Sequence, residues 1–212
     1  GVPEVMLKLR NEGLLNLDVV TSTGLTLREN LDWWEQSEKR DFVRKQLKDS
    51  RNIDPEDVIH SLKNSKKKNM TSTVTFPKGN IAPEGSVVKS TAIDKTVIDD
   101  DGVYRKIGPA RIFISEADAI KAVKDKGANG VKAGDIMVIA CGGPKGTGMQ
   151  EVAQITIALK YLSYGKEVAL ITDGRFSGVS TGACIGHIGP EALDGGPIGK
   201  LKENDLIEIN ID

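Results

Sequence analysis

Two short, almost uninterrupted apolar runs stand out in the second half of the chain. They cover residues 136–140 and 168–171, and an amphipathic stretch at 152–162 lies between them, with its apolar residues at helical spacing. Apolar strands of this kind are buried on both faces of a sheet, and parallel neighbours need a long connection, usually a helix. The pattern therefore predicts a βαβ unit and a mixed α/β fold.

Other elements are predicted around this unit. Ser115, with Asp118 three residues later, predicts the start of a helix that Gly127 ends. β-branched, apolar or alternating runs predict strands at 71–76, 86–89, 111–114 and 206–211.

The first 70 residues are polar and rich in charge, and their pattern is helical. Pro3 and Asp54-Pro55 predict two helix starts, and the lysines at 66–68 predict a solvated loop. One helix stripe is predicted from Leu31, Trp34, Phe42, Val43 and Leu47. The chain opens without an initiator methionine, so we expect it to be a piece of a longer protein. We expect a boundary between residues 1–70 and 71–212.

Charge and composition exclude several classes of protein. With 29 basic and 30 acidic residues the formal net charge is −1, whereas nucleic-acid-binding domains normally have a basic excess. There is no apolar run of about 18 residues, so we expect no membrane span. We recognise no secretory signal. Two cysteines are too few for a disulfide framework, and they favour a reducing, cytoplasmic setting.

Glycine is distributed unevenly and indicates where a site lies. Five of the 23 glycines fall in residues 1–100 and eighteen in 101–212. The segments after the two buried strands, 141–150 and 172–189, are especially rich in glycine. Ligands bind at the carboxyl ends of parallel strands, so we expect a site formed by these two loops.

The loop at 141–150 leads into a helix, whose free N–H groups favour an anion such as a carboxylate or phosphate. Gly148-Met149-Gln150 does not match a Walker A loop, and Glu151 stands where a dinucleotide fingerprint needs glycine. The residues therefore give no support to ATP or NAD. Glu151 either compensates the helix dipole or binds a hard cation such as Mg²⁺.

The loop at 172–189 presents Ser177 at a turn, but Arg175 excludes a nucleophile elbow of the Gly-x-Ser-x-Gly type. Asp173 and Arg175 either pair with each other or hold the loop. We interpret His187 as a hydrogen-bonded structural residue. Cys141 and Cys184 are interpreted as small buried residues, because an iron–sulfur cluster usually needs more thiolates.

Several blocks in these regions carry a family resemblance. They read KGNIAPEGSVVK at 78–89, GPAR at 108–111, GPKGTGM at 143–149, GRFSG at 174–178, CIGHIGPEA at 184–192 and GGPI at 195–198. In sequence and order they resemble the dihydroxy-acid dehydratase and phosphogluconate dehydratase family, and residues 1–6 resemble the end of its N-terminal domain. Segments 71–77, 90–94 and 177–183 look most like the sugar-acid branch that dehydrates xylonate. Residues 59–65 lack the Arg-Pro segment of branched-chain members.

The resemblance implies removal of water from a 2,3-dihydroxy carboxylate to give a 2-keto-3-deoxy acid. In the family an iron–sulfur cluster acts as Lewis acid on the leaving hydroxyl, Mg²⁺ holds the carboxylate end and a serine takes the C2 proton. Carried over, Ser177 is the base, Glu151 an Mg²⁺ ligand, and Ser180 and Thr147 contact substrate.

The resemblance also implies a fold and partners. The expected fold is a β-barrel-like swivelling β/β/α domain flanked by helices, with a short N-terminal helical remnant. The cluster ligands would lie in an N-terminal domain outside this chain, so the fragment alone is expected to be inactive, and the whole enzyme to be a homo-oligomer. The alternatives are a branched-chain dihydroxy-acid or phosphogluconate dehydratase fragment, and a non-catalytic anion-binding swivelling module.

Overall fold

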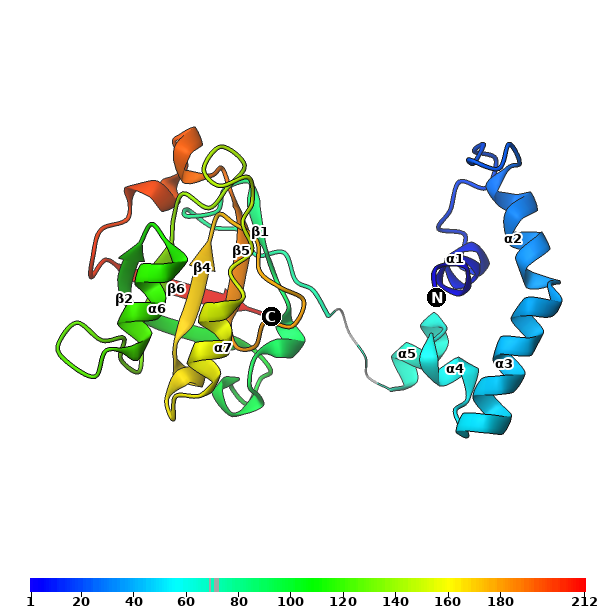
Figure 1. Ribbon diagram of the computed structural model, residues 1–212, viewed down its shortest axis with the longest axis horizontal. Helices are drawn as coiled ribbons and strands as arrows, with labels where there is room; N and C mark the ends of the chain where they lie inside the picture. The colour runs from blue at the N-terminus through cyan, green and yellow to red at the C-terminus, as the bar shows by residue number, and fades with distance from the viewer. Residues whose placement is uncertain (69, 71–72) are drawn as a thin grey trace. The chain divides into compact units, whose positions relative to one another are not determined.

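The protein was analysed as a computed structural model that describes residues 1–68, 70 and 73–212. The chain divides into two compact units, Gly1–Thr71 and Ser72–Asp212. The first is helical, and the second is built around a β-sheet (Figure 1). Each unit is described by itself.

The first unit begins its helices at side chains that cap them. Thr26 forms a capping box with Glu29, and Ser37, Asp54 and Ser61 each accept a backbone N–H at a helix start. The helices are α1 (Val2–Asn11), α2 (Leu27–Glu35), α3 (Glu38–Arg51), α4 (Pro55–Val58) and α5 (Leu62–Lys67).

Ion pairs connect these helices where apolar burial is sparse. Glu4 accepts hydrogen bonds from Trp34 Nε1 at 2.9 Å and Arg40 Nε at 2.7 Å, and Glu56 pairs with Arg44 at 2.8 Å. Among the described residues of this unit, the only buried apolar side chains are Leu7 and Leu31.

Two expectations for this unit are wrong. The predicted single stripe is split between α2 and α3, because Ser37 caps a new helix, and Phe42 and Val43 are exposed. Lys66 and Lys67 do not lie in a loop but end α5, where cations favour the helix dipole, while Lys68 follows as the C-cap. All three are exposed, as predicted.

The second unit contains one six-stranded sheet in the order β1-β5-β4-β3-β2-β6. The four central strands are parallel, and β1 and β6 are antiparallel to their neighbours at the two edges. The strands are β1 (Gly85–Val88), β2 (Tyr104–Phe113), β3 (Ile136–Ile139), β4 (Ala169–Thr172), β5 (Cys184–Gly189) and β6 (Leu206–Ile211).

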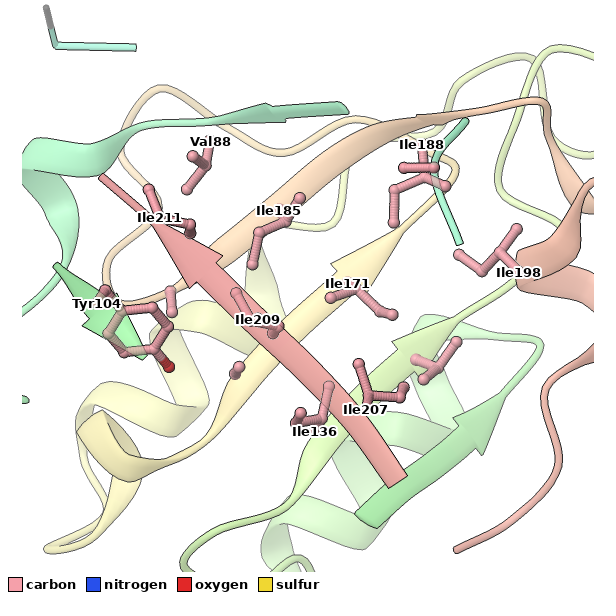
Figure 2. Close-up of a cluster of buried hydrophobic side chains, with 14 of the residues drawn as sticks. Val88, Tyr104, Ile136, Ile171, Ile185, Ile188, Ile198, Ile207, Ile209 and Ile211 are labelled. Atoms are coloured by element: carbon pink, nitrogen blue, oxygen red, sulfur yellow. The ribbon is translucent and has the colours of Figure 1, made fainter. Parts of the chain in front are cut away.

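The sheet is curled into a half-barrel with a hydrophobic cluster on each face. Figure 2 shows β6 crossing over the central strands, so that its alternating Ile207, Ile209 and Ile211 lie in one cluster with Ile171 and Ile185. On the other face α6 (Glu116–Lys124) and α7 (Gln154–Lys160) cover residues such as Met137 and Leu170. Burial on both faces explains the uninterrupted apolar runs in β3 and β4.

Most predicted elements of this unit are confirmed, and several bounds differ. The helix predicted at 152–162 is the shorter α7, and α6 ends at Lys124 before Asp125 rather than at Gly127. The strand predicted at 71–76 lies partly outside the described residues. Within them, Thr75 forms an isolated bridge with Val88.

Candidate active site

The two glycine-rich loops meet at the carboxyl ends of β3 and β4. Val152 N donates to Arg175 O at 2.9 Å, and Glu151 and Arg175 form an isolated parallel bridge. The parallel pairing of β3 with β4 makes the loops start side by side, as the sequence predicts. The backbone at position 151 thus lies beside the segment that carries Ser177.

Ser177 is half-buried at the tip of the loop after β4. Its Oγ accepts a hydrogen bond from Val179 N at 3.3 Å, and its carbonyl oxygen accepts one from Ser180 N at 2.9 Å. Lys89 Nζ donates to the carbonyl oxygen of Gly178 at 2.9 Å, which ties a cation to the same turn. The Ser177 hydroxyl is thus held in a defined turn.

Glu151 is exposed, and within the described residues its carboxylate has no hydrogen bond or ion pair. It precedes α7, whose first N–H groups are satisfied from elsewhere, because Glu116 Oε1 accepts from Gln154 N at 2.9 Å and Ile155 N at 3.4 Å. Compensation of the helix dipole is therefore supplied by Glu116, and the Glu151 carboxylate is open to a cation.

Of the other two predicted residues, Ser180 is buried and Thr147 forms hydrogen bonds within its own loop. Ser180 is 4% exposed, and its Oγ lies 3.3 Å from the Thr156 hydroxyl on α7. Thr147 is exposed, but its hydroxyl donates to Gly142 O at 3.0 Å and accepts from Gln150 N at 3.1 Å. Both side chains have intramolecular partners that set the course of the loops.

Two buried carboxylates, Asp173 and Glu191, hold the two loops. The sequence leaves two roles open for Asp173 and assigns none to Glu191. Asp173 is 1% exposed and accepts N–H bonds from Cys141, Gly142 and Ala192. Both oxygens of Glu191 accept from Lys145 N, at 2.9 and 3.0 Å. Of the two roles left open for Asp173, holding the loop is therefore the one observed.

These carboxylates also explain why the first loop contains glycine. A Cβ at Gly143 would lie 2.1 Å from Glu191 Oε2, so that no larger residue fits there. The N–H groups of Cys141, Gly142 and Lys145 bind carboxylates of this chain, so these three are not open to an external anion.

His187 differs from the expected hydrogen-bonded histidine. Its side chain is exposed at a φ of 56°, and its ring meets Phe176 edge-on, with the centroids 6.0 Å apart. Cys141 and Met149 also have positive φ, each 66°. Such backbone is uncommon outside glycine and gathers at functional sites. No sequence motif predicts positive φ at Cys141, Met149 or His187.

A hollow of about 430 Å³ opens beside these residues. Its lining includes Met149, His187, Glu84, Glu191 and Asp194.

The cysteines do not fit an iron–sulfur cluster. Cys184 is buried, as predicted, whereas Cys141 is only half-buried. Burial raises the pKa of the Cys184 thiol to about 12, and burial also raises the pKa of Cys141, so neither favours the thiolate that a cluster requires. Among the described residues there is no group of three His, Cys, Asp or Glu side chains placed to hold a metal. Glu151 fits Mg²⁺ as a single oxygen ligand of a larger set.

Comparison with known proteins identifies the family of this chain. The family model described as dihydroxy-acid/6-phosphogluconate dehydratase, C-terminal, matches residues 57–212. The chain belongs to this family. The match covers both loops and the whole sheet, and confirms the resemblance seen in the sequence.

Curated members of the family match this chain over its whole length. Two D-xylonate dehydratases of Escherichia coli, YjhG and YagF, are 62% and 59% identical to it. A dihydroxy-acid dehydratase of Agathobacter rectalis is 44% identical. The chain spans about a third of the length of these relatives, with 32% coverage of the first two and 33% of the third. Among the described residues, no helix is long and apolar enough to cross a membrane.

Proposed function

We propose that this chain is the C-terminal part of a hydro-lyase that dehydrates a 2,3-dihydroxy sugar acid of the xylonate type to a 2-keto-3-deoxy acid. The names of the two most similar relatives described above support this substrate class. The observation that carries the proposal is the bridge between Glu151 and Arg175, because it brings the backbone of Glu151 next to the loop that carries Ser177.

In this proposal Ser177 Oγ accepts the C2 proton of the substrate. A serine hydroxyl is a weak base, and it needs nearby positive charge to stabilise its oxygen as an anion. Lys89, bound to Gly178 O, contributes one cation near the turn. Glu151 would be one ligand of Mg²⁺, which supplies further positive charge when bound. The remaining metal ligands, and all ligands of any cluster, would come from outside this chain.

The test uses the full-length enzyme that contains this chain. Ser177→Ala should abolish turnover of xylonate while leaving the absorbance of any cluster unchanged, and Glu151→Gln should raise the Mg²⁺ concentration needed for activity. Wild-type turnover by Ser177→Ala would remove the serine from its role. The isolated chain should show no turnover, and normal rates from it alone would refute the division of the site between two parts.

A branched-chain dihydroxy-acid dehydratase is the second candidate, supported by the Agathobacter rectalis relative. A panel of sugar acids and branched-chain dihydroxy acids separates the two. We expect the higher kcat/KM on a sugar acid, and the opposite ranking would favour the second candidate.

A further inference from the structure

Three loops that follow successive neighbouring strands converge on one buried side chain. Asp173 comes directly after β4, and its carboxylate accepts N–H bonds from the loops after β3 and β5. Oδ1 binds Gly142 N at 2.8 Å, and Oδ2 binds Cys141 N at 3.2 Å and Ala192 N at 2.8 Å. The carboxylate is therefore a junction between three separate segments of the chain.

The segments held by Asp173 are those that carry the proposed reacting groups. Gly142 lies in the loop that leads to Glu151, and Asp173 begins the loop that carries Ser177. Glu191, next to Ala192, binds Lys145 N and fastens the first loop a second time. Displacement of the carboxylate would shift both loops relative to each other.

We propose that Asp173 is a positioning residue of the dehydratase site, which sets the distance between the Glu151 and Ser177 loops through its bonds to Cys141, Gly142 and Ala192. This inference rests on the proposed function, since it concerns the same site. Asp173 is buried behind the loops, so its effect is exerted through them. Misplacement of reacting groups by about 1 Å can lower activity about 100-fold, even when the substituted residue lies away from the chemistry.

Asparagine is the most informative substitution, because it keeps the size of the side chain. Its amide nitrogen cannot accept, so at least one of the N–H groups now bound by Asp173 loses its partner. Asp135 offers a matched control. It is also a buried carboxylate that accepts a backbone N–H, from Lys132 at 2.8 Å, and it pairs in addition with Arg111 at 3.2 Å. It immediately precedes β3 and so lies at the opposite end of that strand from the loops.

The experiment compares Asp173→Asn and Asp135→Asn in the full-length enzyme. Thermal unfolding, turnover and the Mg²⁺ concentration for half-maximal activity are measured for each. We expect both variants to unfold at lower temperature. Asp173→Asn alone should lower kcat and raise the half-maximal Mg²⁺ concentration, each about tenfold or more. Equal kcat and Mg²⁺ values in the two variants would overturn the proposal and leave Asp173 with a purely structural role.

Ala192→Pro keeps the test decisive if Asp173→Asn does not fold. Ala192 is the first residue of a 3₁₀ turn, and Glu191 before it has φ −65° and ψ 159°, which suit a following proline. The change removes one N–H bond to Asp173. Lower kcat with a higher Mg²⁺ requirement supports the proposal, and wild-type values refute it.

Failure of this inference is distinguishable from failure of the proposed function. If Ser177→Ala is inactive but Asp173→Asn and Ala192→Pro keep wild-type kinetics, only the positioning role is wrong. If Ser177→Ala retains turnover, the proposed function fails whatever Asp173 does.

Discussion

Phe176 lies directly before Ser177, and its ring fills the space above Gly186 on β5. A Cβ built at Gly186 would lie 2.6 Å from Phe176 Cδ1. The same ring contacts His187 edge-on. Because Gly186 has no side chain, the ring of Phe176 can occupy this space next to Ser177.

Gly186→Ala should move Phe176 and lower turnover of the full-length enzyme about 10- to 100-fold, because small displacements of reacting groups are costly. Steady-state kinetics measures the change, and circular dichroism shows whether the fold is kept. Gly79→Ala is the matched control, since a Cβ there meets no atom within 4 Å. Equal turnover of the two variants would show that the position of the Phe176 ring does not affect catalysis.

At the scale of elements, a side chain of α6 caps the start of α7. Ala153 at the start of α7 provides no side-chain cap, and Glu116 from the first turn of α6 supplies it. The sequence predicts Ser115 as the cap of α6, and the structure confirms it. The cap of α7 depends on the packing of the two helices over the sheet, which local sequence does not specify.

Glu116→Ala should destabilise the sheet-containing unit by about 1 kcal/mol, the usual cost of a lost N-cap. Glu116→Gln should cost less, because its amide oxygen still accepts the N–H of Gln154. Urea unfolding followed by circular dichroism measures both. An alanine variant as stable as the wild type would mean that solvent satisfies the start of α7 equally well.

The helical unit depends on carboxylates that are paired with cations. Burial disfavours the charged form of Glu4, but bonds from Arg40 and Trp34 outweigh it, so that the pKa of Glu4 is lowered from its ordinary 4.5. Hydrogen bonds from Lys8 and Arg44 lower the pKa of Glu56 in the same way. Lowered pKa values stabilise the folded form above the unfolded-state pKa and lose this effect as pH falls through the folded value.

We therefore expect the helical unit to unfold first when the pH is lowered below about 4.5. The fluorescence of Trp33 and Trp34 reports on this unit alone, because these are the two tryptophans of the chain. Glu4→Gln should weaken the unit at neutral pH and flatten its acid response. A fluorescence profile unchanged by this substitution would contradict the assignment.

At the scale of the whole molecule, the two units differ in how much apolar surface they bury. The sheet-containing unit has hydrophobic clusters on both faces of its sheet, whereas the helical unit buries Leu7 and Leu31 among its described residues. Large side chains such as Trp33 and Phe42 remain exposed there, at 66% and 61%. Domains of this size are only marginally stable even with a full core.

Expressed separately, residues 73–212 should unfold cooperatively on heating, and residues 1–70 should show no cooperative transition. Circular dichroism at increasing temperature measures both fragments. A sharp transition in the fragment 1–70 would show that its ion pairs and caps are sufficient for folding.

The sequence by itself determined the class of the fold, the βαβ unit and the two loops that form the candidate site. These features depend on local rules, because apolar periodicity, cap residues and glycine content act over a few positions. Ser177 and Glu151 were found through motifs within those loops, and their catalytic roles stay predictions.

Only the tertiary structure decided which groups hold the site together. Asp173, Glu191 and Glu116 bind backbone N–H groups 19 to 46 residues away in the chain. Nothing in a linear pattern distinguishes a buried carboxylate with such partners from a solvated one. The curled sheet brings the partners together, and it therefore determines which acids support the loops and which one remains open to a cation.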